Sequence, residues 1–200
     1  MKIRKPATTK FEINEYSKNR WSPRAFDPRP IEKDKIQRLF EAARWSPSAS
    51  NEQPWHFMIG FHNDPTWKKI FELLAPGNKV WNENVPVLMI CIGREVTLAK
   101  KSEYAWYSYD CGQSVAHLSF EAMHQGLYVH QMAGFDAEKA ATVFSLPEHY
   151  KALTAIAVGY AGDPDLLPEE LKVRELAERS RKDFNSFVFS ESFGQSSGLF

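Results

Sequence analysis

The chain has 200 residues, a length typical of one globular domain, and we expect residues 1–200 to form a single domain. Its 25 Lys and Arg residues equal its 25 Asp and Glu residues, so no basic excess indicates a nucleic-acid partner. No apolar run has the length of a membrane span, and residues 1–16 lack the apolar core of a secretion signal. We therefore expect a cytoplasmic protein with no nucleic-acid or membrane partner.

Apolar spacing predicts helices and strands along the whole chain. Residues 12–19 are expected to form a short first helix, and the apolar positions that follow predict a second helix that ends near Trp45, before Pro47. Continuous apolar runs are typical of buried strands and predict strands at 55–61, 85–93 and 152–160. Further helices are predicted at 65–74, 108–125 and 168–178.

A few strands dispersed among many helices favour an α+β layered sheet. The segment 183–200 lacks periodicity but carries five phenylalanines, so we expect it to pack on a surface, with a second subunit as one candidate. Cys91 and Cys111 are far apart in the sequence and have apolar or small neighbours. They are interpreted as reduced core thiols rather than a disulfide.

The stretch RWSPRAFDP contains a row of polar side chains. Ser22 precedes a proline, which favours extended backbone, and in an extended chain Arg20, Ser22 and Arg24 point the same way. Such a row suits an anion such as a phosphate. The alternative, for an isolated motif, is a solvated surface strand.

Two further stretches carry groups that suit a flat polar ligand. Residues 43–60 contain a loop of short hydroxyl and amide side chains that can hydrogen-bond a heterocycle or a ribityl chain, although ordinary turn chemistry would use the same residues. In the stretch 126–136, the small Ala133 and Gly134 permit close approach to the backbone. The alternative there is a helix–loop–helix connection with Asp136 as a helix N-cap.

Several common functional motifs are missing from the sequence. Neither G-x-G-x-x-G nor a P-loop is present, which argues against the usual dinucleotide and nucleoside-triphosphate sites. Ser114 lies in a predicted helix and lacks the context of a hydrolase nucleophile. His117 and His124 are seven residues apart without further ligands nearby, so we expect packed or exposed histidines rather than a metal site.

Taken together and in this order, these stretches resemble the FMN-dependent nitroreductase family. The resemblance runs over nearly the whole chain, through RWSPRAF, AARWSPSASNEQPW, GNKVWNENVPVLMI, YDCGQSVAHLSFEAMHQGL, HQMAGFD, AIAVGYAGDP and RSRKDFNSFVF. It implies an α+β fold with a central, mostly antiparallel sheet flanked by helices. It also implies an intertwined homodimer that exchanges C-terminal segments and holds two FMN molecules at the interface.

The resemblance assigns roles to individual residues. Arg20 and Ser22 would hold the phosphate and ribityl end of FMN, and Arg24 would lie near the pyrimidine edge, where a cation stabilises the reduced flavin. The flavin would also be lined by a loop from the other subunit, formed by Pro47, Ser48, Ala49, Ser50 and Asn51, with Gln53 assisting.

The remaining assignments concern the flavin N5 and the second half of the phosphate clamp. The backbone of Ala133 and Gly134, after Met132, would face N5. Many family members have glycine at the position of Ala133. Because the expected donor is a backbone N–H, alanine should serve there if its φ is negative. Arg179 and Arg181 would complete the phosphate clamp, with Lys182 as the competing candidate. Asn78 would meet the polar edge of the flavin.

The implied activity is that of an FMN-dependent NAD(P)H oxidoreductase. NADH or NADPH would deliver hydride to flavin N5 and leave, and a nitroaromatic, quinone or similar flat aromatic acceptor would then take its place in a ping-pong reaction. No dedicated catalytic side chain is required. Trp106 and Tyr107 are candidates for a wall of the acceptor pocket or for packing. The alternatives are an FMN storage or sensing protein, a specialised flavin chemistry such as dehalogenation or substrate oxidation, and a structural module without flavin.

Overall fold

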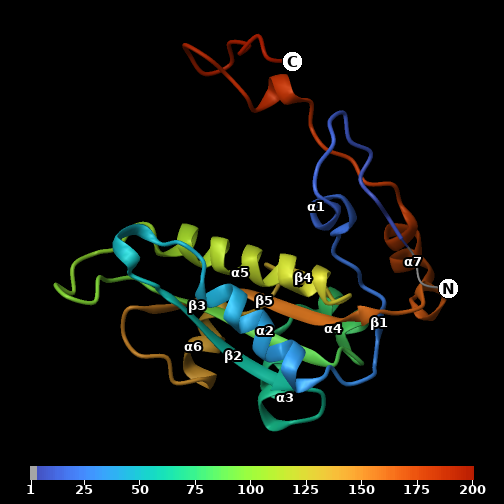
Figure 1. Cartoon of the computed structure of the whole chain (residues 1–200). Coiled ribbons are helices and arrows are strands. Elements are labelled where there is room, and N and C mark those ends of the chain that lie inside the picture. Colours follow the sequence, from blue (N-terminus) through green and yellow to red (C-terminus); the bar gives the residue numbers. More distant parts are fainter. Residues whose placement is uncertain (1–3) are drawn as a thin grey trace.

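An antiparallel five-stranded sheet runs through the centre of the protein (Figure 1). The computed structural model describes residues 4–200. β3 and β5 form the middle of the sheet, with β2 beyond β3 and with β4 and β1 paired to β5. The strands are β1 (Phe26–Asp27), β2 (Trp55–Phe61), β3 (Val87–Arg94), β4 (Tyr128–Met132) and β5 (Tyr150–Ala161). All of these described pairs are antiparallel, as expected.

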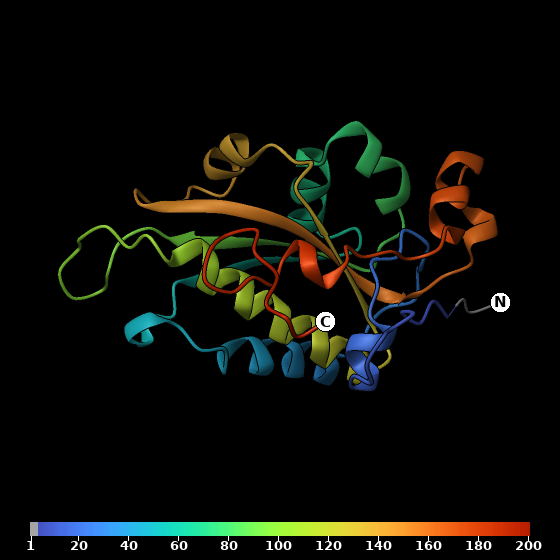
Figure 2. The ribbon, with the colours of Figure 1, turned by 90° about the horizontal axis from the view of Figure 1, so that it is seen from above.

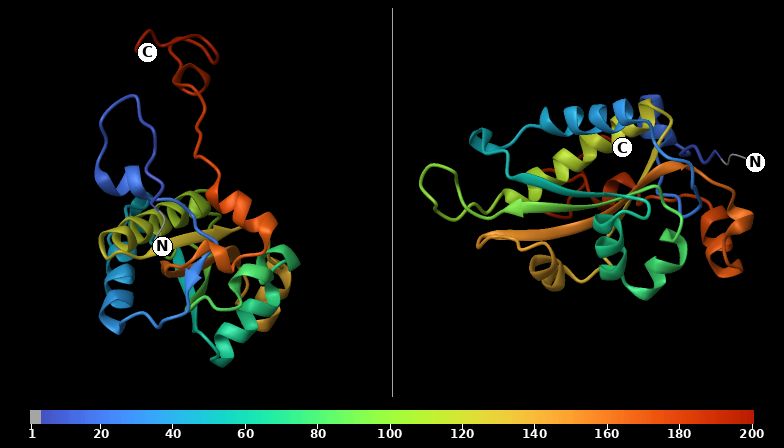
Figure 3. Two further views of the ribbon diagram at one scale, coloured as in Figure 1. Left: turned by 90° about the vertical axis from the view of Figure 1, so that its right-hand side faces the viewer. Right: turned by 90° about the horizontal axis from the view of Figure 1, so that it is seen from below.

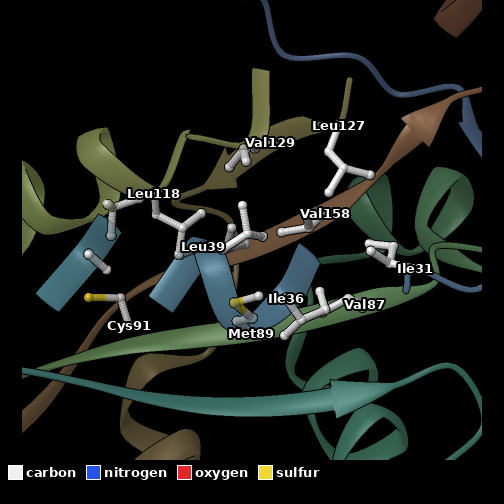
Figure 4. Packing of buried hydrophobic residues seen from close by; sticks show 14 of the residues in the cluster. Ile31, Ile36, Leu39, Val87, Met89, Cys91, Leu118, Leu127, Val129 and Val158 are labelled. Atoms are coloured by element: carbon white, nitrogen blue, oxygen red, sulfur yellow. The ribbon is translucent and has the colours of Figure 1, made fainter. Parts of the chain in front are cut away.

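Helices cover both faces of this sheet, which explains why β3 is apolar at nearly every position (Figure 3). Val87, Met89 and Cys91 belong to one core cluster with residues of α2 and α5, part of which Figure 4 shows. Leu88 and Ile90 belong to a second cluster on the other face, with residues of α3, α4 and α6. The helices are α1 (Glu15–Asn19), α2 (Lys33–Arg44), α3 (Pro65–Leu73), α4 (Pro76–Asn82), α5 (Tyr107–His124), α6 (Ala137–Val143) and α7 (Glu169–Leu176).

α5 is the longest described helix and spans the length of the sheet. Its 18 residues correspond to about 27 Å. Its inner side is buried at Val115, Leu118, Ser119 and Ala122. Gly126 follows the helix with a φ of 73°, a left-handed conformation that suits glycine after a helix end.

No strand was predicted from the sequence within residues 126–136, but one is present there. The alternative of a helix–loop–helix connection is excluded, because the chain after Gly126 forms strand β4 and not a loop. Asp136 does cap the following helix, α6, because its carboxylate accepts the backbone N–H of Lys139 at 2.8 Å. β4 has only five residues and its polar His130 and Gln131 interrupt the apolar pattern, so the segment has no clear strand signal. The short elements β1, α4 and α6 were also not predicted.

The C-terminal tail stands away from the helical layers (Figure 1), and Phe11 of the N-terminal segment contacts it. The aromatic tail (residues 183–200) stacks Phe184 on Phe200 with ring centroids 4.2 Å apart, and Phe11 packs against Phe184 at 5.6 Å. Phe193 in the same tail is 95% exposed. In the view from above the tail crosses α5 in projection (Figure 2), but it stands well apart from that helix in Figure 1. The expected absence of a secretion signal concerns residues 1–16, of which 1–3 lie outside the described residues.

The long strands and helices lie close to their predicted positions. β2 occupies residues 55–61 as predicted, and the ends of β3, α3, α5, β5 and α7 differ from prediction by at most two residues. The first helix is shorter than expected and begins at Glu15. Cys91 and Cys111 are buried and free, as expected. Among residues 4–200 no helix has the length and apolar character of a membrane span. The division of the chain into domains stays a prediction.

Candidate functional site

Residues 20–25 form an extended segment with two different sides. Arg20 ends α1 with extended backbone, φ −66° and ψ 127°. Trp21, Pro23 and Ala25 are buried, whereas Arg20, Ser22 and Arg24 are only partly buried. The alternation that the sequence predicts is therefore present, and the polar row is directed away from the core.

A cationic cluster surrounds this row, formed by Lys5, Arg20, Arg24, Arg179 and Arg181. The pKa of Arg20 is lowered by burial and then by the nearby positive charge of Arg181. The pKa of Arg179 is lowered by burial and by Arg20 and Arg181. Within residues 4–200, no carboxylate lies within 4.0 Å of Arg20 or Arg181. Partly buried guanidinium groups that repel each other, with no carboxylate beside them among residues 4–200, have the chemistry that suits an anion.

Arg179 also fastens the N-terminal segment. Its Nη1 donates to the backbone carbonyls of Lys5 at 2.6 Å and Lys18 at 2.9 Å. Within the described part of the chain, Arg181 has no such interaction with a distant residue and donates to its neighbour Ser180, at 2.7 Å. Lys182 is exposed and does not affect the pKa of Arg20. Of the two arginines at 179–182, Arg181 is thus the one whose guanidinium lies near Arg20 without being held by a distant part of the described chain.

Glu175, a residue that the sequence analysis did not identify, supports the row from behind. It lies on α7 and is 1% exposed. Its carboxylate accepts the backbone N–H of Arg24 at 2.9 and 3.0 Å and that of Ala25 at 3.1 Å. Its Oε2 lies 3.9 Å from the guanidinium of Arg24. One acidic residue in an amphipathic helix carries no sequence signal of such a role.

His130 on β4 lies next to the same row. Its Nδ1 donates to the carbonyl of Pro23 at 2.7 Å, and its ring lies 4.5 Å from that of Trp81. Burial lowers the pKa of His130 to about 4, and the charge of Arg24 contributes to the shift. His130 is therefore neutral near pH 7, and Arg24 remains the fixed positive charge at this position.

The turn after β4 is held by α4. The carbonyl of Gly134 accepts Nδ2 of Asn78 and the backbone N–H of Ala75, both at 2.9 Å. A Cβ on residue 134 would lie 2.8 Å from Nδ2 of Asn78, so glycine permits this contact. Ala133 is exposed and does not have a positive φ, which meets the condition for a backbone donor there. The side chain of Met132 is buried, so only its backbone is available at the turn.

The 47–53 loop lies far from the cationic cluster within one chain. Ala49 donates its backbone N–H to Asp110, in the first turn of α5, at 3.2 Å. Tyr16 of α1, four residues before Arg20 in sequence, is hydrogen-bonded to His124, in the last turn of α5, at 2.6 Å. Fourteen residues of helix, about 21 Å, separate these anchor points. The structure brings together Arg20, Ser22, Arg24, Arg179 and Arg181, and it joins Asn78 to Gly134, but it leaves Pro47, Ser48, Ala49, Ser50, Asn51 and Gln53 at the other end (Figure 1).

The fold is that of an α+β protein, and a cluster of cationic side chains lies beside its sheet. Comparison with known proteins agrees: residues 17–81 match the sequence profile of the nitroreductase family. A solved structure described as an oxidoreductase containing FMN is 31% identical and superposes with a TM-score of 0.89, covering 94% of this chain and 96% of that one.

Two further relatives extend the comparison. A protein of Methanothermobacter thermautotrophicus named "Putative NADH dehydrogenase/NAD(P)H nitroreductase" is 27% identical over 78% of this chain and 80% of its own length. An NADH dehydrogenase of Thermus thermophilus is 26% identical over 72% of this chain and 84% of its own. The chain belongs to the nitroreductase family.

Proposed function

We propose that this protein is an FMN-dependent NAD(P)H oxidoreductase that reduces nitroaromatics, quinones or similar flat aromatic acceptors in a ping-pong reaction. The observation that carries the proposal is the cationic cluster, in which Arg20 and Arg181 lie close together without a carboxylate partner among residues 4–200. The 31% identity to a solved oxidoreductase containing FMN supports the same cofactor here. Buried, free Cys91 and Cys111 support the expected cytoplasmic location.

The residues of the site fit the parts of FMN. Arg20, Ser22 and Arg181 would hold the phosphate and ribityl end, because guanidinium groups suit a dianionic phosphate. Arg24 would lie at the pyrimidine edge of the ring, and the backbone of Ala133 and Gly134 at N5. When bound, FMN takes two electrons with a proton from the nicotinamide donor and passes them to the acceptor.

The chain's own contribution is binding and a fixed electrostatic field. Glu175 fixes the backbone of Arg24 and Ala25, so the Arg24 side chain starts from a defined position. A preorganised cation at this point stabilises negative charge that develops on a reduced ring. Asn78 and Ala75 fix the turn at Gly134. No side chain is required as a nucleophile or as a dedicated proton donor.

A homodimer would complete the site. Because the 47–53 loop and the cationic cluster lie at opposite ends of α5, one chain does not surround a flavin on both sides. We propose that the loop of the partner subunit lines the flavin bound by the first subunit. The exposed aromatic side chains of Trp106, Tyr109 and Phe193 support the burial of further surface between subunits.

Anaerobic stopped-flow absorbance of the FMN-loaded protein tests the proposal. We expect NADH or NADPH to bleach the oxidised-flavin band at about 450 nm, and the faster donor identifies the preferred nicotinamide. Bound FMN that neither donor bleaches would favour a storage protein or a specialised flavin chemistry. A wild-type protein that fails to bind FMN would overturn the proposal.

A further inference from the structure

The 48–53 loop has an unusual backbone. Ser50, Asn51 and Gln53 have φ values of 52°, 55° and 46°, in the left-handed region. None of the three is a glycine, the residue that adopts this region without cost. Such a conformation persists only where surrounding contacts hold it. The loop contributes no residue to either core cluster, so these contacts must come from elsewhere.

One support comes from α5 and the segment before it. Asp110 is 2% exposed, and its Oδ2 accepts the backbone N–H of Ala49 at 3.2 Å. The hydroxyl of Tyr104 donates to the same carboxylate oxygen and lies 3.1 Å from the carbonyl oxygen of Ala49. Burial and the neighbouring carboxylate raise the pKa of Tyr104, so the hydroxyl keeps its proton at neutral pH. Two buried polar side chains therefore bracket the backbone of Ala49.

A second support comes from the end of β3. Arg94 is 2% exposed, and its Nη2 donates to the carbonyl of Glu52 at 2.7 Å and to the Glu52 carboxylate at 3.0 Å. The same carboxylate accepts the backbone N–H of Leu98 at 2.9 Å. Inside the loop, the hydroxyl of Ser48 accepts the backbone N–H of Gln53 at 3.0 Å. The loop is thereby fixed at both ends.

Buried charges are a costly way to stabilise a loop that adds no apolar core. Removing Arg94 and Asp110 from water carries a desolvation penalty that hydrogen bonds must offset. The result of this arrangement is a defined shape: protein groups hold the backbone at Ala49 and Glu52, while Ala49, Ser50, Asn51 and Gln53 remain exposed. Preorganisation of this kind lowers the entropy lost when a ligand binds.

We propose that Tyr104, Asp110 and Arg94 are positioning residues that hold the 48–53 loop in the conformation in which it contacts the flavin ring bound by the other subunit. The inference rests on the proposed function, since it takes the flavin as the loop's ligand. The three residues do not touch the cofactor themselves. They act through the backbone of Ala49 and Glu52.

The test compares two tyrosines that are equally buried and each have two hydrogen-bond partners, but that lie at different positions. Tyr104 is 6% exposed and Tyr160 is 5% exposed. The Tyr160 hydroxyl bonds to Glu32 and to Lys35, each at 2.5 Å, away from the loop. Tyr104→Phe and Tyr160→Phe therefore each remove one buried, doubly partnered hydroxyl. We expect both to lower the urea midpoint of the FMN-free protein, but only Tyr104→Phe to weaken FMN binding, by about tenfold in Kd.

A second measurement separates positioning from general destabilisation. The visible absorbance spectrum of bound FMN should shift in Tyr104→Phe and remain unchanged in Tyr160→Phe, because only the first alters the surroundings of the ring. Asp110→Asn, which keeps the shape of the side chain, should reproduce the Tyr104→Phe result and serves if that variant does not fold. Equal FMN affinity and spectra in Tyr104→Phe and wild type, or equal losses in both phenylalanine variants, would overturn the inference. Failure of the wild-type protein to bind FMN would instead overturn the proposed function.

Discussion

The carboxylate of Glu175 and the backbone of Arg24 are joined by two hydrogen bonds of 2.9 and 3.0 Å, across 151 residues of sequence. The contact links helix α7 to the extended row at the cationic cluster. It places a buried negative charge behind the row, while the guanidinium groups are directed away from the core. The C-terminal part of the chain thus positions residues near the N-terminus.

Glu175→Gln should lower stability and weaken FMN binding together. The amide keeps one acceptor oxygen, but its NH2 group faces backbone N–H donors, which leaves a buried donor unsatisfied at a cost of about 1–3 kcal/mol. Urea denaturation of the FMN-free protein measures the first effect, and titration with FMN measures the second. Glu170→Gln, on the exposed side of α7, is the control. Equal midpoints for the two variants would contradict the role of Glu175.

Arg20→Ala should weaken FMN binding by a factor of about 10 to 150. This range corresponds to the loss of a charge-assisted hydrogen bond of about 1.5–3 kcal/mol. Riboflavin, which lacks the phosphate, should bind wild type and variant equally. The control is Arg38→Ala, an exposed arginine of α2 paired with Asp34 at 3.3 Å. An unchanged Kd for FMN would remove Arg20 from the phosphate site.

Mixed dimers test whether two subunits share one flavin site. One subunit carries Arg20→Ala with Arg181→Ala, and the other carries Asn51→Val, a β-branched residue that disfavours the φ of 55° at this position. Each parent homodimer should bind FMN weakly at both sites. A mixed dimer should regain one tight site per dimer, because one intact cluster meets one intact loop. Isothermal titration of purified mixed dimers counts the tight FMN sites. If the mixed dimer has no more tight sites than the parents, the cationic cluster and the 47–53 loop of one flavin site come from the same chain.

His130 should make the protein less stable in mild acid. Its pKa is about 4 in the folded protein, against about 6.5 in an unfolded chain, so the unfolded chain binds more protons between these values. The stabilisation is complete above pH 6.5 and is lost as the pH falls toward 4, by up to about 3 kcal/mol. Urea midpoints at pH 7 and pH 5 measure this loss, and His130→Gln should reduce it. His56→Gln, at an exposed position of β2, is the control variant.

Much of the architecture was predictable from local sequence patterns. Apolar runs and apolar spacing predict the strands at 55–61 and near 85–93 and 152–160, and the long helix near 108–125. These patterns are local, and packing against a neighbouring layer stabilises the same elements. The row of Arg20, Ser22 and Arg24 was also predictable, because the residue before a proline is extended and an extended chain alternates its sides. Short elements such as β4 and α6 were missed because their form depends on partners distant in sequence.

The sequence by itself determined the fold class, the polar row and the loop residues, since these depend on side-chain type and on the local backbone period. Only the tertiary structure decided which charges meet. It set Arg181 beside Arg20, placed Glu175 behind Arg24, and separated the 47–53 loop from the cluster by most of the length of α5. Contacts of this kind join segments as far apart as Arg24 and Glu175, 151 residues in sequence, and they depend on how the helices pack on the sheet, which no local pattern encodes.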